Sequence, residues 1–181
     1  MPINLVIDEE EYFNEATSEF EVVGGFEIEL EHSLVSLSKW ESEVKKPFLS
    51  KEDKTAKEIL TYIQCMVISP IYPAGFAARL TQEHIDKVKA YIESSQSATT
   101  FGDMPKTRGP GETITTELIY YWMVAFNIPF ECEVWHLSRL FSLIRICNIK
   151  NQKPKKMSRG EIAARNRRIN EERRARYNTR G

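Results

Sequence analysis

The chain has 181 residues, of which 41% are hydrophobic and 28% are charged, and its formal net charge is −1. These values are typical of a globular protein and exclude disordered, collagen-like and membrane-spanning classes for the chain as a whole. The sequence contains no apolar run of about 18 residues, and its first residues lack the basic and apolar stretches of a secretory signal. We therefore expect one compact domain with an appendage, in the cytoplasm of the cell that makes it.

The first 32 residues predict a small β element. Residues 3–7 (INLVI) predict a short strand, and residues 20–31 alternate apolar and glutamate side chains on both sides of Gly24 and Gly25. Such alternation around a glycine pair is typical of a β-hairpin, so we place the turn at the two glycines. The apolar side chains would then face a core, and the glutamates would face water.

The next segment changes to helical spacing. Apolar residues between Leu34 and Val44 predict a short helix that ends before Pro47. Ser50 begins a sequence that resembles a capping box, which predicts a second helix over 51–66.

Thr81 is a candidate N-cap, and it predicts a third helix over 82–94. Residues 95–112 are rich in Ser, Thr, Gly and Pro, and they predict a long internal loop. Loops of this length in compact domains are usually functional or mobile.

Residues 114–127 are apolar on nearly every helical face, which indicates a helix that is central in the core or covered by a partner. Pro129 ends this helix, and the apolar spacing of 131–149 predicts another. With the short NIPFE connection between them, the two helices would form an αα-hairpin.

The C-terminal segment differs in charge from the rest of the chain. Residues 150–181 hold 12 Lys and Arg against 3 Asp and Glu, whereas residues 1–149 hold 13 against 23. A capping box from Ser158 to Glu161 predicts a final helix over 159–175. Because this helix has little apolar surface to bury, we expect it to be exposed, or ordered with a partner.

These patterns predict a mainly α (α+β) fold. We expect a helical bundle with a small N-terminal β-hairpin or sheet and a basic C-terminal helical tail. The corresponding parts are 1–32 as the N-terminal β element, 33–149 as the helical body, and 150–181 as the basic tail.

The sequence contains no pattern that indicates catalysis, a metal site or a cofactor. Phosphate-binding and zinc-protease motifs are absent. The cysteines are odd in number and have no CxxC spacing, so we expect buried thiols in a reducing compartment. The histidines have no metal-binding spacing, and we expect the acidic run Asp8–Glu11 to be solvated. These residues are Cys65, Cys132, Cys147, His32, His84 and His136.

One cysteine and one histidine have the spacing of neighbours on a helix. Cys132 and His136 are four residues apart and would share a face of the predicted helix over 131–149. A nucleophile and its base need a direct hydrogen bond and a third orienting group. Side chains on one helix seldom have that geometry, so we expect a core thiol beside a structural histidine. The chain is accordingly interpreted as a protein without enzymatic activity.

Seven aromatic side chains lie within residues 120–141. They are compatible with a rich core and with a hydrophobic groove for a partner, since large exposed aromatic side chains are typical interface anchors. Exposure is not visible in a sequence, so both interpretations remain open here.

The basic tail has three interpretations. It could bind nucleic acid through phosphate contacts, which would be sensitive to salt. It could dock on an acidic protein surface, including that of a neighbouring copy. It could also be a solvated tail without a partner. Its only aromatic residue is Tyr177, so base stacking is not strongly indicated.

Three segments resemble a family of small proteins of tailed bacteriophages, the tail assembly chaperones. The segments are 31–66, 114–151 and 153–181, which together cover more than half of the chain. The second is the most specific, because it combines a central Trp, NIPFE and WHLSRL.

The resemblance implies a function without a cofactor or a reaction. Members of the family coat the long tape measure protein while the tail is built, recruit tail tube subunits, and are absent from the finished virion. The expected location is therefore the host cytoplasm. The division of charge would also allow the chain to associate with itself. The candidate partner-binding residues are Trp122, Phe126, Phe130 and Trp135 in the aromatic segment, and Arg165, Arg167, Arg168, Arg173 and Arg174 in the tail.

Two other functions stay open at this point. One is a structural virion protein, such as a neck, tail-completion or capsid-associated subunit. The other is a small nucleic-acid-binding protein that acts through the basic tail. Neither requires a membrane or a cofactor.

Overall fold

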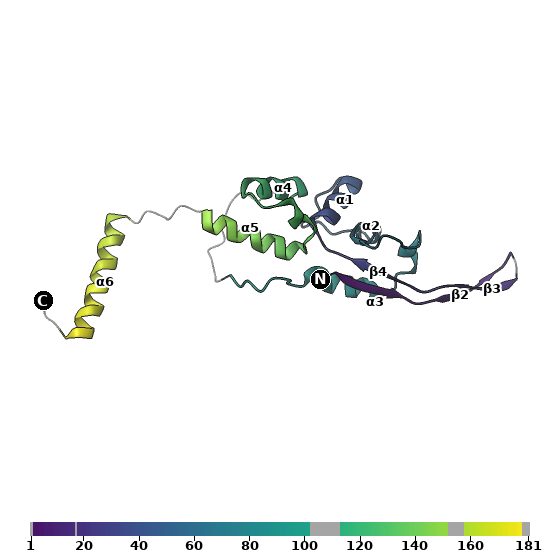
Figure 1. The fold of residues 1–181 in the computed structure, drawn as a ribbon, viewed down its shortest axis with the longest axis horizontal. Coiled ribbons are helices and arrows are strands. Elements are labelled where there is room, and N and C mark those ends of the chain that lie inside the picture. Colours follow the sequence, from purple (N-terminus) through teal and green to yellow (C-terminus); the bar gives the residue numbers. More distant parts are fainter. Residues whose placement is uncertain (1, 17, 102–112, 152–157, 179–181) are drawn as a thin grey trace. The chain divides into compact units, whose positions relative to one another are not determined.

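The computed structural model describes residues 2–16, 18–101, 113–151 and 158–178 (Figure 1). The chain divides into two compact units, Met1–Asn148 and Ile149–Gly181. The mainly helical α+β class is confirmed. The strands are β1 (Ile3–Ile7), β2 (Glu10–Asn14), β3 (Glu19–Val23) and β4 (Phe26–Leu30). The helices are α1 (Leu34–Val44), α2 (Ala56–Met66), α3 (Gln82–Glu93), α4 (Thr116–Ala125), α5 (Leu137–Asn151) and α6 (Arg159–Tyr177), with short 3-10 helices η1 (Phe76–Arg79) and η2 (Phe130–Val134).

The four strands form two antiparallel pairs, which follow one another along a single ribbon. In the inner ribbon β1 pairs with β4, and Ile3 lies opposite Leu30. In the outer ribbon β2 pairs with β3, and Glu10 lies opposite Val23. The outer ribbon continues beyond the helices of the first unit (Figure 1).

The predicted hairpin turn at the glycine pair is wrong. The chain reverses between β2 and β3, where the Asn14 carbonyl accepts from the Ser18 N–H at 2.8 Å and its side chain accepts from the Ala16 N–H at 2.9 Å. Such a side-chain bond two residues ahead stabilises a turn without glycine. Because the reversal occurs here, β4 pairs with β1 and not with β3.

The glycine pair lies at the junction between the two halves of the ribbon. A Cβ atom built on Gly25 would come within 3.0 Å of the Ile7 carbonyl oxygen and 3.1 Å of the Glu9 nitrogen. A Cβ built on Gly24 would meet no atom within 4 Å. Gly25 is therefore needed for close approach of two backbones.

Arg79 holds this junction from the end of η1. Its guanidinium donates to the carbonyls of Asp8 at 2.5 Å and Gly24 at 3.1 Å. It also lies 5.0 Å from the centre of the Phe26 ring, and its Nε is 3.6 Å from a Glu10 carboxylate oxygen. One side chain thus binds both strands where the ribbon leaves the body.

The hydrophobic core lies between the inner ribbon and the helices. Ile28 and Leu30 are buried, as the alternation predicted for the second half of 20–31. Phe20 and Val22 are 69% and 61% exposed, so the prediction that they face a core is wrong. The core is made by Leu5, Ile7, Ile28, Leu30, Leu34, Leu37, Trp40, Tyr62, Ile63, Met66, Val88, Tyr91, Ile119, Met123, Leu137, Leu140 and Ile144.

The second helix begins later than the sequence predicted. Its capping box starts at Thr55, whose hydroxyl accepts from the Glu58 N–H at 3.3 Å while the Glu58 carboxylate accepts from the Thr55 N–H at 2.8 Å. Ser50 is therefore not the cap. Lys46 also binds Glu58, at 2.7 Å, which favours the later start.

Three other helices lie close to their predicted ranges. Thr81 caps α3 and Ser158 forms the capping box with Glu161 at the start of α6, both as predicted, and α1 is capped by Ser33, which was not predicted as a cap. Local hydrogen bonds within four residues account for these starts.

The helix predicted over 131–149 begins later in the structure. Phe130–Val134 forms η2, and α5 begins only at Leu137. His136 instead forms an isolated antiparallel bridge with Ser33, and the Leu137 N–H donates to the His32 carbonyl at 2.7 Å. This long-range pairing requires extended backbone, so the connection between α4 and α5 is not the tight hairpin turn expected.

Candidate partner-binding groove

An open groove of about 460 Å³ lies between α4 and α5. On α5 its residues are spaced at i, i+3, i+4 and i+7, and on the α4 side at i and i+4, so each side contributes a single helical face. The α5 side consists of Phe141, Ile144, Arg145 and Asn148, and the α4 side consists of Trp122 and Phe126.

The position of α4 is set by its start and its buried face. Thr115 caps the helix, and Glu41 of α1 accepts from the Thr116 backbone N–H at 2.8 Å and from its hydroxyl at 2.7 Å. Ile119 and Met123 are buried against the core. Trp122 lies next to Met123 in this helix and lines the groove.

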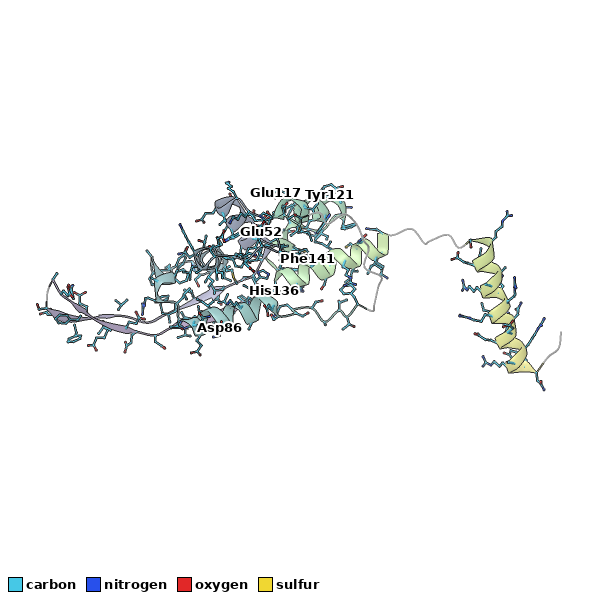
Figure 2. The ribbon with its side chains drawn as sticks, turned by 180° about the vertical axis from the view of Figure 1, so that it is seen from behind. Glu52, Asp86, Glu117, Tyr121, His136 and Phe141 are labelled. Carbon is cyan, nitrogen blue, oxygen red and sulfur yellow. The ribbon has the colours of Figure 1, made fainter. Side chains whose placement is uncertain are left out.

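Helix α4 also has an open apolar side away from the groove. Tyr121 is 65% exposed and Val124 is exposed as well. Figure 2 shows Glu117 and Tyr121 along α4 at the outside of the body, and Phe141 on α5. The helix is thus not central in the core, because only one of its faces is buried, although its sequence is apolar on almost every face.

The groove is apolar with one cationic edge. Arg145 is exposed at its rim, with its guanidinium carbon 4.0 Å from the centre of the Phe101 ring. Asn148, also exposed, is the only other polar side chain of the lining. No carboxylate lines the groove, so a segment that binds there would meet apolar surface and positive charge.

The four predicted aromatic anchors do not form one surface. Trp122 and Phe126 line the groove together. Phe130 is 54% exposed on η2, and its ring centre is 6.3 Å from that of Tyr120. Trp135 is half-buried under Arg139, whose guanidinium carbon is 4.1 Å from its ring.

The five predicted arginines all lie on α6, in the second unit, and all are exposed. One of them, Arg168, is 3.6 Å from a carboxylate oxygen of Glu172. The others are Arg165, Arg167, Arg173 and Arg174.

A buried polar cluster lies where the inner ribbon meets the helices. His32 Nδ1 is 2.5 Å from the Tyr62 hydroxyl, and the Tyr91 hydroxyl donates to Glu31 at 2.5 Å. The rings of His32 and His136 lie with centres 5.2 Å apart. Burial, and then the neighbouring His136, lower the pKa of His32 to about 4.

The same burial changes the other groups of the cluster. It lowers the pKa of His136, and it raises the pKa values of the Tyr62 and Tyr91 hydroxyls. The polar atoms bond to one another and to backbone inside the core, so the cluster holds the inner ribbon to α2, α3 and the start of α5. Sequence reasoning missed it because the three histidines showed no local spacing.

Cys132 and His136 do not share a helical face. Cys132 lies in η2, whereas His136 lies in the extended bridge and binds Ser138 Oγ at 2.8 Å through Nδ1. Among the described ranges, no three His, Cys, Asp or Glu side chains come together as a metal-binding group. In the same part of the chain, no helix combines the length and apolar character needed to cross a membrane.

The α5 side of the groove was also missed by sequence reasoning. The apolar spacing of 131–149 predicted a helix, but it did not show that Phe141 and the buried Ile144 also line a groove. The i, i+3, i+4 spacing was a signal, but it does not distinguish a buried face from a groove wall.

Comparison with known proteins adds no relative to this description: the chain matches no protein-family model, no curated protein and no solved structure.

Proposed function

We propose that this chain is a tail assembly chaperone of a tailed bacteriophage, and that it holds a helical segment of the tape measure protein in the groove between α4 and α5. The resemblance of residues 31–66, 114–151 and 153–181 to that family supports the proposal. The observation that carries it is the open apolar groove itself, lined by Trp122 and Phe126, over which no element of the described residues lies.

The shape and chemistry of the groove favour a helical ligand. Two helical faces form its walls, and amphipathic helices bind such grooves by anchors spaced at i, i+3, i+4 and i+7. Its volume of about 460 Å³ lies within the range of about 300–1,000 Å³ that is typical of binding clefts. Arg145 would pair with an acidic residue beside the anchors of the partner.

Under this proposal the chain acts by binding and needs no cofactor. Tail tube subunits are the second expected partner, and the chain is expected in the host cytoplasm and not in the mature virion. Apolar surface of a long partner would be covered until the tube assembles around it.

The test is co-expression of the tagged full chain with the tape measure protein encoded in the same genome, followed by purification after nuclease treatment. Trp122→Ala and Asn148→Trp should each reduce recovery of the tape measure protein at least about tenfold, a loss of about 1.4 kcal/mol. The first removes an anchor, and the second fills the groove from an exposed position.

Tyr121→Ala is the matched control, because Tyr121 is on the open side of the same helix. Circular dichroism of each variant shows whether it is folded. Equal recovery by Asn148→Trp, Trp122→Ala and the unchanged chain would contradict the groove as the binding site. Recovery of the chain in purified virions would favour a neck, tail-completion or capsid-associated subunit.

A further inference from the structure

The charge asymmetry of the chain is confined to its two ends. Residues 1–38 hold ten Asp and Glu and no Lys or Arg, and residues 39–149 hold thirteen of each sign. Residues 150–181 hold 12 Lys and Arg against 3 Asp and Glu. The acidic end contains the ribbon, and the basic end contains α6.

The exposed helix α6 carries its isoleucines on one side. No residue of α6 is buried. At 3.6 residues per turn, the two isoleucines share one face with three arginines, two glutamates lie along one edge of that face, and the third lies on the opposite side. The face consists of Ile162, Arg165, Ile169, Arg173 and Arg176, its edge carries Glu161 and Glu172, and Glu171 lies opposite.

The outer ribbon has a face that no other described element covers. Residues directly opposite each other in an antiparallel pair lie on the same face. Phe13 lies opposite Phe20, and Glu11 lies opposite Val22. Phe13 is 51% exposed, and its ring centre is 5.2 Å from that of Phe20. This face therefore combines apolar surface with the carboxylate of Glu11 at its margin.

We propose that α6 of one copy docks on the outer ribbon of a second copy. Ile162 and Ile169 would cover the apolar face of Phe13, Phe20 and Val22, and the arginines beside them would pair with the carboxylates of the ribbon. Arginine suits this contact because its planar fork binds a carboxylate through two parallel hydrogen bonds.

A second copy is favoured over the same chain by the layout of the first unit. The Asn148 end of α5, from which the tail departs, lies at the opposite end of this unit from the turn between β2 and β3 (Figure 1). The contact joins two different surfaces of the chain, so it is heterologous and adds copies head to tail. This inference is independent of the proposed function of the groove.

The same helix is less suited to a nucleic-acid duplex. A helix in a groove has phosphates on more than one side. Glu171, on the side opposite the isoleucines, would be repelled there, whereas docking on the ribbon through the isoleucine face leaves it in solvent.

The experiment measures the mass of the nuclease-treated full chain by sedimentation equilibrium. In about 0.1 M salt, where the Debye length is about 10 Å, the weight-average mass should rise at least about twofold with concentration. The reference is the monomer mass of 21.0 kDa. In about 1 M salt, with a Debye length of about 3 Å, the mass should fall back toward the monomer.

Charge reversal then identifies the two surfaces. One variant carries Arg165→Glu, Arg173→Glu and Arg176→Glu, and the other carries Glu11→Lys and Glu15→Lys. Each variant alone should remain monomeric, and an equimolar mixture should associate again, because one supplies an acidic ribbon and the other a basic helix.

The control variant carries Lys39→Glu, Lys51→Glu and Lys57→Glu, which changes the net charge as much as the helix variant but lies outside both surfaces. It should associate like the unchanged chain. A monomer at low salt, association that survives reversal of the ribbon charges, or association that nuclease abolishes would each overturn the proposal. The last of these would indicate nucleic acid as the partner of α6.

Discussion

The two halves of the ribbon have the same alternation of apolar and acidic side chains, but only the inner half is covered. Ile28 and Leu30 in β4 are buried under helices, whereas Phe20 and Val22 in β3 are exposed. Alternation identifies the two faces of a strand. It does not reveal whether another layer packs on the apolar face, and here that layer ends at the junction held by Arg79.

The largest difference is expected from truncation of one apolar side chain in each half. Leu30→Ala should lower the free energy of unfolding by about 2–5 kcal/mol, because it leaves a cavity in a close-packed core. Val22→Ala should change it by no more than about 0.5 kcal/mol, as at other exposed positions.

Urea unfolding followed by tryptophan fluorescence measures both variants. The solution should be dilute and contain about 1 M salt, so that contacts between charged surfaces of different copies are screened. Equal losses in the two variants would mean that the outer ribbon is also covered within one chain.

The inner half should also make stability depend on pH. The pKa of His32 falls from 6.5 to about 4 on folding, so between these values the unfolded state binds more protons than the folded state. Stability is therefore unaffected by His32 above about pH 6.5 and is lost as the pH falls toward 4, by up to about 3 kcal/mol. His136, whose pKa is lowered as well, acts in the same direction.

Thermal unfolding across this pH range tests the effect. His32→Gln and His32→Phe both lack the imidazole, so each should show a flatter dependence than the unchanged chain, whatever its stability at neutral pH. An unchanged slope in both variants would show that His32 is not the group responsible.

A smaller effect is expected at the junction between the halves. Arg79→Ala removes the bonds to the Asp8 and Gly24 carbonyls and should cost about 1–3 kcal/mol, as for hydrogen bonds to charged groups. Amide hydrogen exchange in β2 and β3 should become faster, while exchange in β1 and β4 changes little. Arg79→Lys keeps the charge but loses the fork, so it should behave like the alanine variant.

The smallest effect is expected from the two adjacent glycines. Gly25→Ala places a Cβ against the Ile7 carbonyl and should cost about 1 kcal/mol through overpacking. Gly24→Ala meets open space and should change stability by no more than about 0.5 kcal/mol. Thermal unfolding of the pair distinguishes close approach from a general need for glycine, since equal effects would contradict the geometry of the junction.

The candidate groove could be predicted only in part. Trp122 and Phe126 belong to the aromatic cluster of residues 120–141, for which a partner groove was one of two interpretations. Their partners on α5 could not be assigned, because the start of α5 depends on the bridge between Ser33 and His136, which lie about a hundred residues apart. The orientation of Phe130 and Trp135 away from the groove follows from the same late start.

The sequence by itself determined the features that depend on a few neighbouring residues. The caps at Thr81 and Ser158, the helices that follow them and the division of charge are of this kind, because their hydrogen bonds and periodicities are local. Tertiary structure decided which strands pair and which apolar faces are covered. Strand β4 pairs with β1 because that register buries side chains of both strands under the helices. Such burial depends on contacts between segments that are distant in the sequence. The local alternation of β4 is compatible both with pairing to β3 and with pairing to β1.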